Sequence, residues 1–464
     1  MEIGTSDINS TAVIEDALMG IIMQRNNLVV NTSCNIDCVF CSRKFNPYQT
    51  KLFQKDFNLI RAEIGLFTPN KLIHINSAIS TLTDGEPFIH PRIWDILALI
   101  RSKFPYRGLR NLNDKIKITT NGTLMTGNNL KKLEDLKGII LVHSVNSTDV
   151  DDFMKLTGVG RQAAEVAVSL PKRVTNFGIT YSPSIVAMPE VVGYEGVERT
   201  LRDLVKEKSV KHLRVIMPTY TRFAAEAHQK MLHCDREKLE NIIEGIRKST
   251  DKMVVLYPIM PEDVNPKLEG LEHVGITKND EILEIDGQRI FSRSEAMKYL
   301  HYPKKTLRIK FANEYGIRHA EIDPQQLRYE SLVERDMNYD IGFDPINVSR
   351  IIDGHKKILI VTTDLAFKVV KAAFEKLQDW FPETRDHEYS YQIAKNDFYG
   401  GNVVSGGLLT VSDMRKAIKE FIDENGSPDL ILTTRQPFDV LGRDIKRESI
   451  YSLLDEFKVK MIFL

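Results

Sequence analysis

The residues best suited to take part in chemistry are three cysteines close together near the start of the chain. Cys34, Cys38 and Cys41 have the spacing C-x3-C-x2-C, and the fourth cysteine, Cys234, is far away. The loop that carries them directly follows residues 28–32, whose β-branched character predicts a buried strand. A short loop of this kind can give one thiolate to each of three irons of a 4Fe–4S cluster. The fourth iron then keeps an open position, which a catalytic metal site needs for a small molecule.

Two other interpretations of the three thiols are open. A zinc site would use three cysteines and a histidine, and three neighbouring buried thiols could also be accidental. Zinc ligands usually come as paired CxxC units, which this loop lacks. A chain with only four cysteines does not carry a disulfide framework either. We therefore favour the iron–sulfur cluster.

Further polar motifs come at or just after the ends of the next apolar segments. In a barrel of parallel strands, residues that follow the strands gather at one face and build the active site there. We therefore expect these motifs to lie near the cysteine loop. They are Asp84-Gly85-Glu86-Pro87, Thr119-Thr120-Asn121-Gly122, and Ser144 between His143 and Asn146.

The elements that must position these residues alternate between strand and helix patterns up to about residue 260. Apolar residues at three- and four-residue spacing predict helices over 90–104, 196–208 and 234–250. Such alternation predicts parallel strands with right-handed crossovers, and hence a full or partial β/α barrel over residues 27–260. The predicted strands are 28–32, 71–77, 116–121, 139–145, 179–188, 213–218 and 254–259.

The rest of the chain has a different character. Residues 1–26 form a polar lead-in with one predicted helix over 12–23. A linker rich in Pro and Gly begins at 261 and opens a small β-rich domain, 261–312, in which Asp286-Gly287 predicts a tight turn. Residues 313–464 are predicted to form a separate α/β domain, patterned mainly in its last hundred residues.

The cysteine motif, with aromatic Phe40 before its last cysteine, resembles the signature of the radical S-adenosylmethionine (SAM) superfamily. Gly85-Glu86-Pro87 resembles the GGEP element of that superfamily, with Asp84 in place of the first glycine, and Thr120-Asn121-Gly122 resembles its TNG element. The resemblance implies a 4Fe–4S cluster, bound by the three cysteines, whose open iron binds the methionine part of SAM.

The same resemblance implies roles for the other motif residues. Gly85, Glu86 and Pro87 would lie beside the methionine amino group of SAM. Asn121 would point toward the ribose or the carboxylate, and Ser144 would lie near the same groups. The catalytic residue itself stays unassigned. Cys234 is either a structural thiol, the commoner fate of a lone cysteine, or a residue that quenches a radical or binds an extra cluster.

Two later segments resemble known domains. Residues 275–300 resemble the heart of a PDZ-like domain, which binds peptide ends at a sheet edge. Residues 396–414 resemble the C-terminal domain of unknown function found in PDZ-containing radical SAM proteins, although the order of domains differs here. The glycine pairs 400–401 and 406–407 either make tight turns or shape a phosphate or carboxylate pocket.

Composition narrows the function class. The 63 basic and 63 acidic residues balance, so the sequence lacks the basic excess that is typical of nucleic-acid-binding proteins. No apolar run approaches a membrane span, and the acidic, polar start is not a secretory signal, which predicts a cytoplasmic protein. We expect a radical SAM enzyme that is reduced by a flavodoxin or ferredoxin and acts on a small molecule. The alternatives are a peptide-modifying enzyme guided by the PDZ-like domain, and a non-catalytic scaffold with a degenerate barrel.

Overall fold

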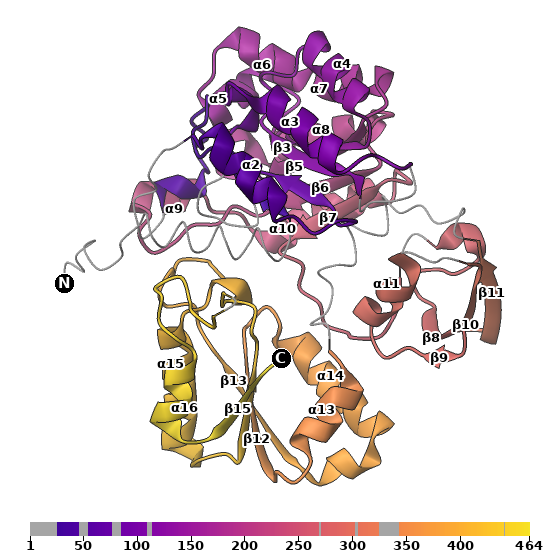
Figure 1. Ribbon diagram of the computed structural model, residues 1–464, viewed down its shortest axis with the longest axis vertical. Helices are drawn as coiled ribbons and strands as arrows, with labels where there is room; N and C mark the ends of the chain where they lie inside the picture. The colour runs from indigo at the N-terminus through magenta and orange to yellow at the C-terminus, as the bar shows by residue number, and fades with distance from the viewer. Residues whose placement is uncertain are drawn as a thin grey trace. The chain divides into compact units, whose positions relative to one another are not determined.

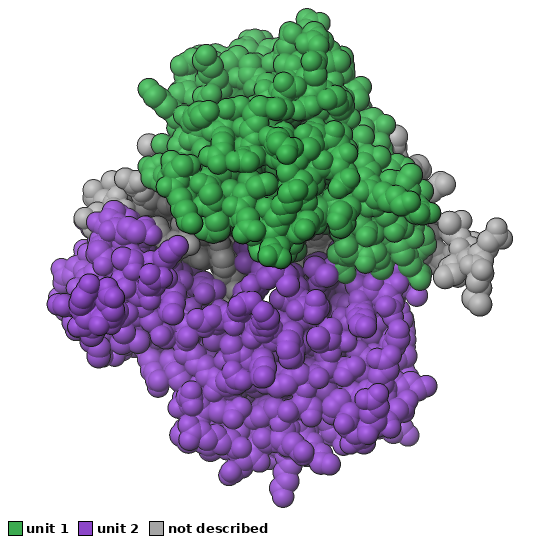
Figure 2. Space-filling view, turned by 180° about the vertical axis from the view of Figure 1, so that it is seen from behind, with its two compact units in different colours: residues 1–258, 399–403 green, residues 259–398, 404–464 purple. Residues whose placement is uncertain are grey.

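The computed structural model describes residues 26–45, 54–76, 85–108, 114–268, 271–301, 305–323, 343–439 and 441–464. The chain forms two compact units, which Figure 2 colours separately. Unit 1 comprises Met1–Pro258 and Tyr399–Val403, and unit 2 comprises Ile259–Phe398 and Val404–Leu464. Asp84 and the helix predicted over residues 12–23 lie outside the described residues.

Unit 1 is built on a seven-stranded sheet in which strand order follows chain order and every neighbouring pair is parallel. This confirms the predicted parallel α/β fold, and such a sheet is consistent with a partial barrel. Each of the seven predicted strands has a counterpart, and these are β1 (Asn27–Leu28), β2 (Ile73–Ile75), β3 (Ile116–Thr120), β4 (Ile139–Ser144), β5 (Thr180–Val186), β6 (His212–Ile216) and β7 (Met253–Tyr257). However, β1 shares only Leu28 with the predicted strand 28–32.

Helices connect the strands of unit 1 (Figure 1). The three predicted helices are present as α3, α8 and α10, and α8 begins at Pro189, earlier than predicted. Side-chain caps start several helices, as Thr126 does for α4 and Asp235 for α10. The helices are α2 (Phe57–Gly65), α3 (Ile93–Lys103), α4 (Gly127–Leu136), α5 (Val150–Thr157), α6 (Arg161–Val168), α7 (Leu170–Arg173), α8 (Pro189–Lys206), α9 (Glu226–Met231) and α10 (Arg236–Arg247), with short 3-10 turns η2 (Ser42–Lys44), η3 (Pro87–Ile89) and η5 (Val174–Asn176).

The two faces of this sheet differ in chemistry. On the outer face, alternate strand residues such as Leu213 and Val215 are buried in one apolar core together with residues of α2, α3, α4, α8 and α10. Because side chains alternate along a strand, the residues between them point to the inner face. The inner residues are Asn27, His74, Lys117, Thr119, Ile140, Val142, Ser144, Thr180, Ser182, Ser184, Val186, His212, Arg214, Ile216, Met253, Val255 and Tyr257.

Unit 2 begins with a four-stranded antiparallel sheet in the order β11-β10-β8-β9. The predicted turn at Asp286-Gly287 joins β8 to β9, and both residues have positive φ. The sheet continues past the predicted boundary at residue 312, because β11 pairs with β10 along its whole length. The elements are η6 (Glu272–Val274), β8 (Glu281–Ile285), β9 (Gln288–Arg289), α11 (Arg293–His301), β10 (Leu307–Asn313) and β11 (Gly316–Ile322).

The remainder of unit 2 has a parallel sheet in the order β13-β12-β14-β15, with helices on both faces. One apolar core joins the sheet to α13 and α14, and a second joins it to α15 and α16. None of the helices described combines the length and apolarity that a membrane span needs. The elements are α13 (Pro345–Ile352), β12 (Lys357–Thr362), α14 (Phe367–Trp380), η7 (Pro382–Asp386), β13 (Glu388–Ile393), η8 (Gly406–Leu408), α15 (Val411–Asn425), β14 (Leu430–Thr433), α16 (Tyr451–Phe457) and β15 (Lys460–Phe463).

Candidate active site

The cysteine loop leaves the end of β1 and is held at several points by the backbone. The Asp37 N–H donates to Thr157 O at 2.9 Å and the Val39 N–H donates to Leu156 O at 3.0 Å, which anchors the loop to α5. A turn follows, in which the Cys41 N–H donates to Cys38 O at 3.2 Å. The three thiols are partly exposed. They are thus presented on one ordered loop while remaining accessible from outside.

The electrostatics of the three sulfurs suit a cationic group. Burial raises the pKa of the Cys38 thiol well above its usual range, and the nearby Cys41 and Cys34 raise it further. Burial also raises the pKa of Cys34. Ionised thiols therefore need a compensating positive charge, which bound iron supplies. Among the residues that the structure describes, no three His, Cys, Asp or Glu side chains converge as ligands of a single metal ion.

Gly85 brings the second motif against the cysteine loop. The Glu86 N–H donates to Ser33 O at 2.8 Å, and the Gly85 N–H donates to Asn31 O at 3.3 Å. A Cβ on residue 85 would lie only 2.0 Å from Ser33 O and 2.6 Å from the carbonyl carbon of Thr32. The two backbones approach too closely for any side chain, so glycine is required here for space rather than for an unusual φ.

Two buried asparagines that the sequence analysis did not single out tie the same loops together. The Asn76 side chain accepts from the Val30 N–H at 2.9 Å and donates to Asn31 Oδ1 and Gly85 O, each at 2.9 Å. The Asn31 side chain in turn donates to Glu86 O at 2.9 Å. The signal for them was weak, because an asparagine at the end of an apolar strand is also a common turn residue.

Glu86 is completely buried and its carboxylate is used inside the protein. It accepts from the Thr120 hydroxyl at 2.8 Å, the Asn121 N–H at 2.7 Å and the Phe88 N–H at 3.2 Å, the last of which caps η3. Burial raises the pKa of Glu86 to about 7, although these three hydrogen bonds lower it. The carboxylate thus joins the loop after β2 to the end of β3. Its predicted contact with the amino group of SAM stays a prediction.

Asn121 lies beside a predicted cluster ligand. Its Nδ2 is 3.6 Å from Cys34 Sγ and donates to Asn35 Oδ1 at 2.8 Å. Its Oδ1 accepts from the Thr123 N–H at 3.0 Å, which fixes the orientation of the amide. A hydrogen bond to a cluster sulfur tunes the reduction potential. The sequence placed Asn121 at the site, and the structure adds this contact with Cys34; its predicted contact with the ribose or carboxylate is untested.

Ser144 ends β4 on the inner face of the sheet and is partly exposed, so its hydroxyl is accessible from the barrel interior. Its neighbour His143 points to the outer face, where Nδ1 lies 2.7 Å from the Tyr181 hydroxyl, and burial lowers the pKa of His143 to about 3. His143 is therefore a neutral core residue. Pro87 occupies the first position of η3, where it needs no N–H partner.

Cys234 lies between α9 and α10, far along the chain from the other cysteines. It is packed against the edge of the outer apolar core, and its Sγ is 3.9 Å from Asp235 O. Burial raises its pKa to about 11, so the thiol is protonated at neutral pH. This environment is typical of a structural thiol.

Residues Tyr399–Val403 belong to unit 1 and contact the loop after β6. The Arg222 N–H donates to Tyr399 O at 2.7 Å, and the Asn402 side chain accepts from the Tyr220 N–H at 2.8 Å. Gly401 has φ +63°, and a Cβ there would lie 2.2 Å from Tyr220 O. The 400–401 pair thus makes a tight turn with a close backbone contact.

A family model matches part of the barrel. Residues 28–204 match the family model of the Radical SAM superfamily. This part of the chain is a radical SAM domain. Enzymes with this domain use a 4Fe–4S cluster and S-adenosylmethionine. The matched residues include all three cysteines of the loop and the Gly85, Asn121 and Ser144 positions.

Several solved structures resemble the chain. The crystal structure of Streptococcus suis SuiB bound to S-adenosylmethionine is 18% identical, with a TM-score of 0.37, over 50% of this chain and 52% of that one. A radical SAM methyltransferase from Sphaerobacter thermophilus is 16% identical, with a TM-score of 0.36, over 50% of this chain and 66% of that one. The chain thus spans about half the length of SuiB. No curated protein matches the sequence. These likenesses are too distant to indicate a substrate.

The donor set of this radical SAM domain fits the cluster that the superfamily uses. Three thiols come from one loop, their charges interact, and an amide N–H lies against one sulfur. Cys34, Cys38 and Cys41 would therefore hold the cluster, and one iron would remain open for SAM. The close backbone junction at Gly85 keeps the loop in place.

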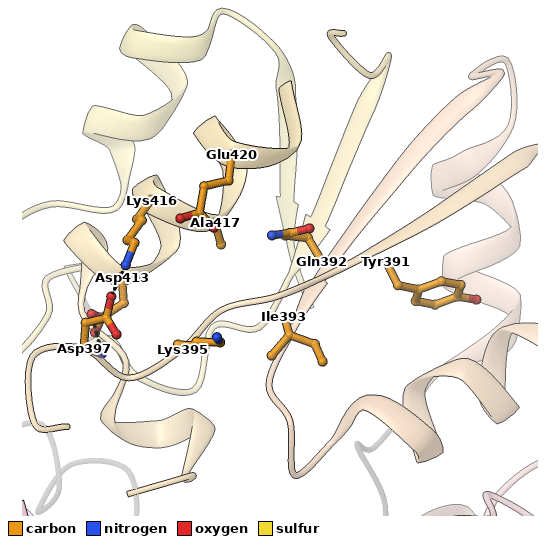
Figure 3. A pocket seen from close by; sticks show the side chains of 9 residues that line it. All are labelled: Tyr391, Gln392, Ile393, Lys395, Asp397, Asp413, Lys416, Ala417 and Glu420. Carbon is orange, nitrogen blue, oxygen red and sulfur yellow. Dashed lines mark hydrogen bonds and ion pairs between the residues drawn. The ribbon is translucent and has the colours of Figure 1, made fainter. Parts of the chain in front are cut away.

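A separate hollow of about 380 Å³ lies outside the radical SAM domain, between β13 and α15 (Figure 3). Three of its charged side chains have partners within the same segment. Lys416 Nζ pairs with Asp397 Oδ2 at 2.5 Å, and Asp413 accepts from the Asp397 and Phe398 N–H groups. We therefore interpret these residues as a local network that holds the loop after β13.

Proposed function

We propose that the protein is a radical SAM enzyme that cleaves S-adenosylmethionine reductively and uses the resulting radical on a substrate. Cys34, Cys38 and Cys41 would hold a 4Fe–4S cluster, which would supply the single electron that reductive cleavage of the sulfur–C5′ bond of SAM needs. Methionine and, after hydrogen abstraction from the substrate, 5′-deoxyadenosine would be the products. The substrate, the net reaction and the fate of SAM stay open.

This chain's own residues hold and tune the site. Cys34, Cys38 and Cys41 give one thiolate each. The backbone around Gly85 fixes the cysteine loop, and buried Glu86 links that backbone to the end of β3. The amide of Asn121 donates toward Cys34 Sγ, which stabilises negative charge on that sulfur. We expect Ser144, which is accessible on the inner face, to hydrogen-bond SAM.

The observation that carries the proposal is the ordered cysteine loop itself. Three thiols with the radical SAM spacing are held by hydrogen bonds to α5 and to the loop after β2, inside residues that match the superfamily. A degenerate scaffold has no need to keep three thiols, a glycine with no room for a side chain, and an amide beside a sulfur. The scaffold alternative is therefore the weaker one.

The test is anaerobic turnover of the full chain. The protein is reconstituted with iron and sulfide, reduced with dithionite and given S-adenosylmethionine, and 5′-deoxyadenosine is measured by mass spectrometry. We expect product from the wild type and none from Cys38→Ala, whereas Cys234→Ala should keep both cluster and product. A wild type that binds no 4Fe–4S cluster would overturn the proposal.

Two further features belong to the same proposal. We propose a flavodoxin or ferredoxin as the physiological reductant, because the cluster needs single electrons at low potential. We expect a small-molecule substrate, and a peptide is the alternative. Competition of a random peptide library against 5′-deoxyadenosine formation, compared with a library of small acids and phosphates, would separate the two classes.

A further inference from the structure

Arg214 presents an unusual group on the inner face of the radical SAM sheet. It lies in β6 between Leu213 and Val215, which both point into the outer core, so its own side chain points inward. Its Nη2 donates to the Ser182 hydroxyl at 3.3 Å. Its Nε is buried and has no hydrogen-bond partner among the residues that the structure describes. A guanidinium cannot lose its charge in a protein, so this N–H is an unmet donor on a permanent cation.

No carboxylate balances this charge within the described part of the chain. Arg214 takes part in none of the ion pairs found there. The inner positions of the seven strands include His74, Lys117 and His212 besides Arg214, and none of these positions is Asp or Glu. Arg214 as a whole is partly buried, but its Nε is a buried, unsatisfied donor on a cation. Such a donor costs free energy unless a ligand, best an anion, completes it.

Hydroxyl groups lie in the same row of the sheet. Arg214 is the register partner of Ser184, and Ser184 is the register partner of Ser144. Ser182 Oγ lies 2.9 Å from His212 Nε2 and so joins the arginine to an imidazole. One guanidinium flanked by hydroxyls is the combination that binds carboxylate or phosphate oxygens.

The carboxylate of S-adenosylmethionine is the other candidate anion. By the proposed function, that carboxylate chelates the open iron at the cysteine loop, which follows β1, whereas Arg214 lies in β6, five strands later in the strand order. The binding test below separates the two sources.

We propose that Arg214 binds an anionic group of the substrate, a carboxylate or a phosphate, inside the barrel. The inference rests on the proposed function, since it assigns the barrel interior to a substrate. It narrows the substrate to acids and phosphate esters, with the anion held on β6 and the reacting carbon directed toward the cluster side.

The test measures anion binding without turnover. The reconstituted full chain is titrated calorimetrically with inorganic phosphate and with acetate at constant ionic strength. The variants are Arg214→Met, Arg214→Lys and, as matched control, Arg202→Met, an exposed arginine of α8 paired with Glu198. We expect saturable binding of at least one anion to the wild type and the control. Arg214→Met should weaken it at least tenfold, and Arg214→Lys less, because the charge remains but the planar fork is lost.

Binding of S-adenosylmethionine to the same proteins decides the source of the anion. We expect Arg214→Met to change its Kd less than threefold. A tenfold loss would assign the arginine to the cofactor carboxylate and overturn the inference. Equal anion binding by wild type and Arg214→Met, or no binding by the wild type, would also overturn it. Should Arg214→Met not fold, the charge-retaining Arg214→Lys variant decides by its weakened anion binding. Formation of 5′-deoxyadenosine is measured separately, so failure of this inference is distinct from failure of the proposed function.

Discussion

Replacement of Gly85 by alanine should prevent assembly of the cluster while the barrel stays folded. The added Cβ would lie 2.0 Å from Ser33 O, whereas a carbon and a carbonyl oxygen pack at about 3.3 Å or more. One backbone must therefore move by roughly 1.3 Å. That movement also stretches the hydrogen bonds from the Gly85 and Glu86 N–H groups to Asn31 O and Ser33 O.

The magnitude follows from these contacts. Overpacking of this kind costs about 1–3 kcal/mol, and two weakened backbone hydrogen bonds cost about 1 kcal/mol each. A total of about 3–5 kcal/mol is comparable to the net stability of a small domain, so the junction between the loops should open first. The cysteine loop would then lose one of its two anchors, while the contacts with α5 remain.

The assay is the iron and sulfide content of the reconstituted protein together with 5′-deoxyadenosine formation. Gly245→Ala is the matched control, because Gly245 lies in α10 with nothing within 4 Å of its added Cβ, and alanine there should stabilise the helix by about 1 kcal/mol. We expect Gly85→Ala to lose most of its cluster with secondary structure retained by circular dichroism. A Gly85→Ala protein with full cluster content and full product yield would refute the argument that the backbone junction holds the loop.

Three other outcomes are expected. Burial raises the pKa of Glu86 from 4.5 to about 7, so the folded state binds its proton more tightly than the unfolded state. This contribution to the free energy of unfolding is full below pH 4.5 and falls by up to roughly 3 kcal/mol as the pH rises through 7. Glu86→Gln should therefore make the unfolding midpoint less dependent on pH between pH 5 and 8, and an unchanged dependence would contradict the assignment. Asn121→Leu removes the N–H beside Cys34 Sγ and should lower the cluster reduction potential, measured by redox titration, by tens of millivolts; a potential equal to that of the wild type would exclude the hydrogen bond. Gly401→Ala places a Cβ 2.2 Å from Tyr220 O at a residue with positive φ, and it should speed proteolysis near residue 400. Gly426→Ala, which has open space around its Cβ, should not speed it. Equal cleavage rates for the two variants would count against the contact.

Local pattern was sufficient for most of the fold. The alternating segments of the barrel each bury one apolar face, so their periodicity predicted the seven strands and the parallel arrangement of the sheet. The hairpin at Asp286-Gly287 followed from the same kind of signal, since both residues adopt positive φ. Elements with mixed patterns were missed. The exposed edge strand β11 and helix α13 lie in the polar stretch that follows residue 313. β11 is defined by its backbone pairing with β10, and α13 by the packing of Val348 and Ile352 into the core of unit 2.

The prediction of a cluster site needed only local residue spacing. The spacing of Cys34, Cys38 and Cys41 is a property of one loop, and it predicts a 4Fe–4S cluster with an open iron. The neighbours of that loop could not be predicted in the same way, because they come together only in the folded chain. Asn76 and Arg214 acquire their contacts from other strands and loops, because a hydrogen bond to Gly85 or an inward-facing arginine exists only once the sheet is assembled. The cysteines can be recognised from their spacing, whereas the residues that hold the loop and those that face the substrate depend on strand register.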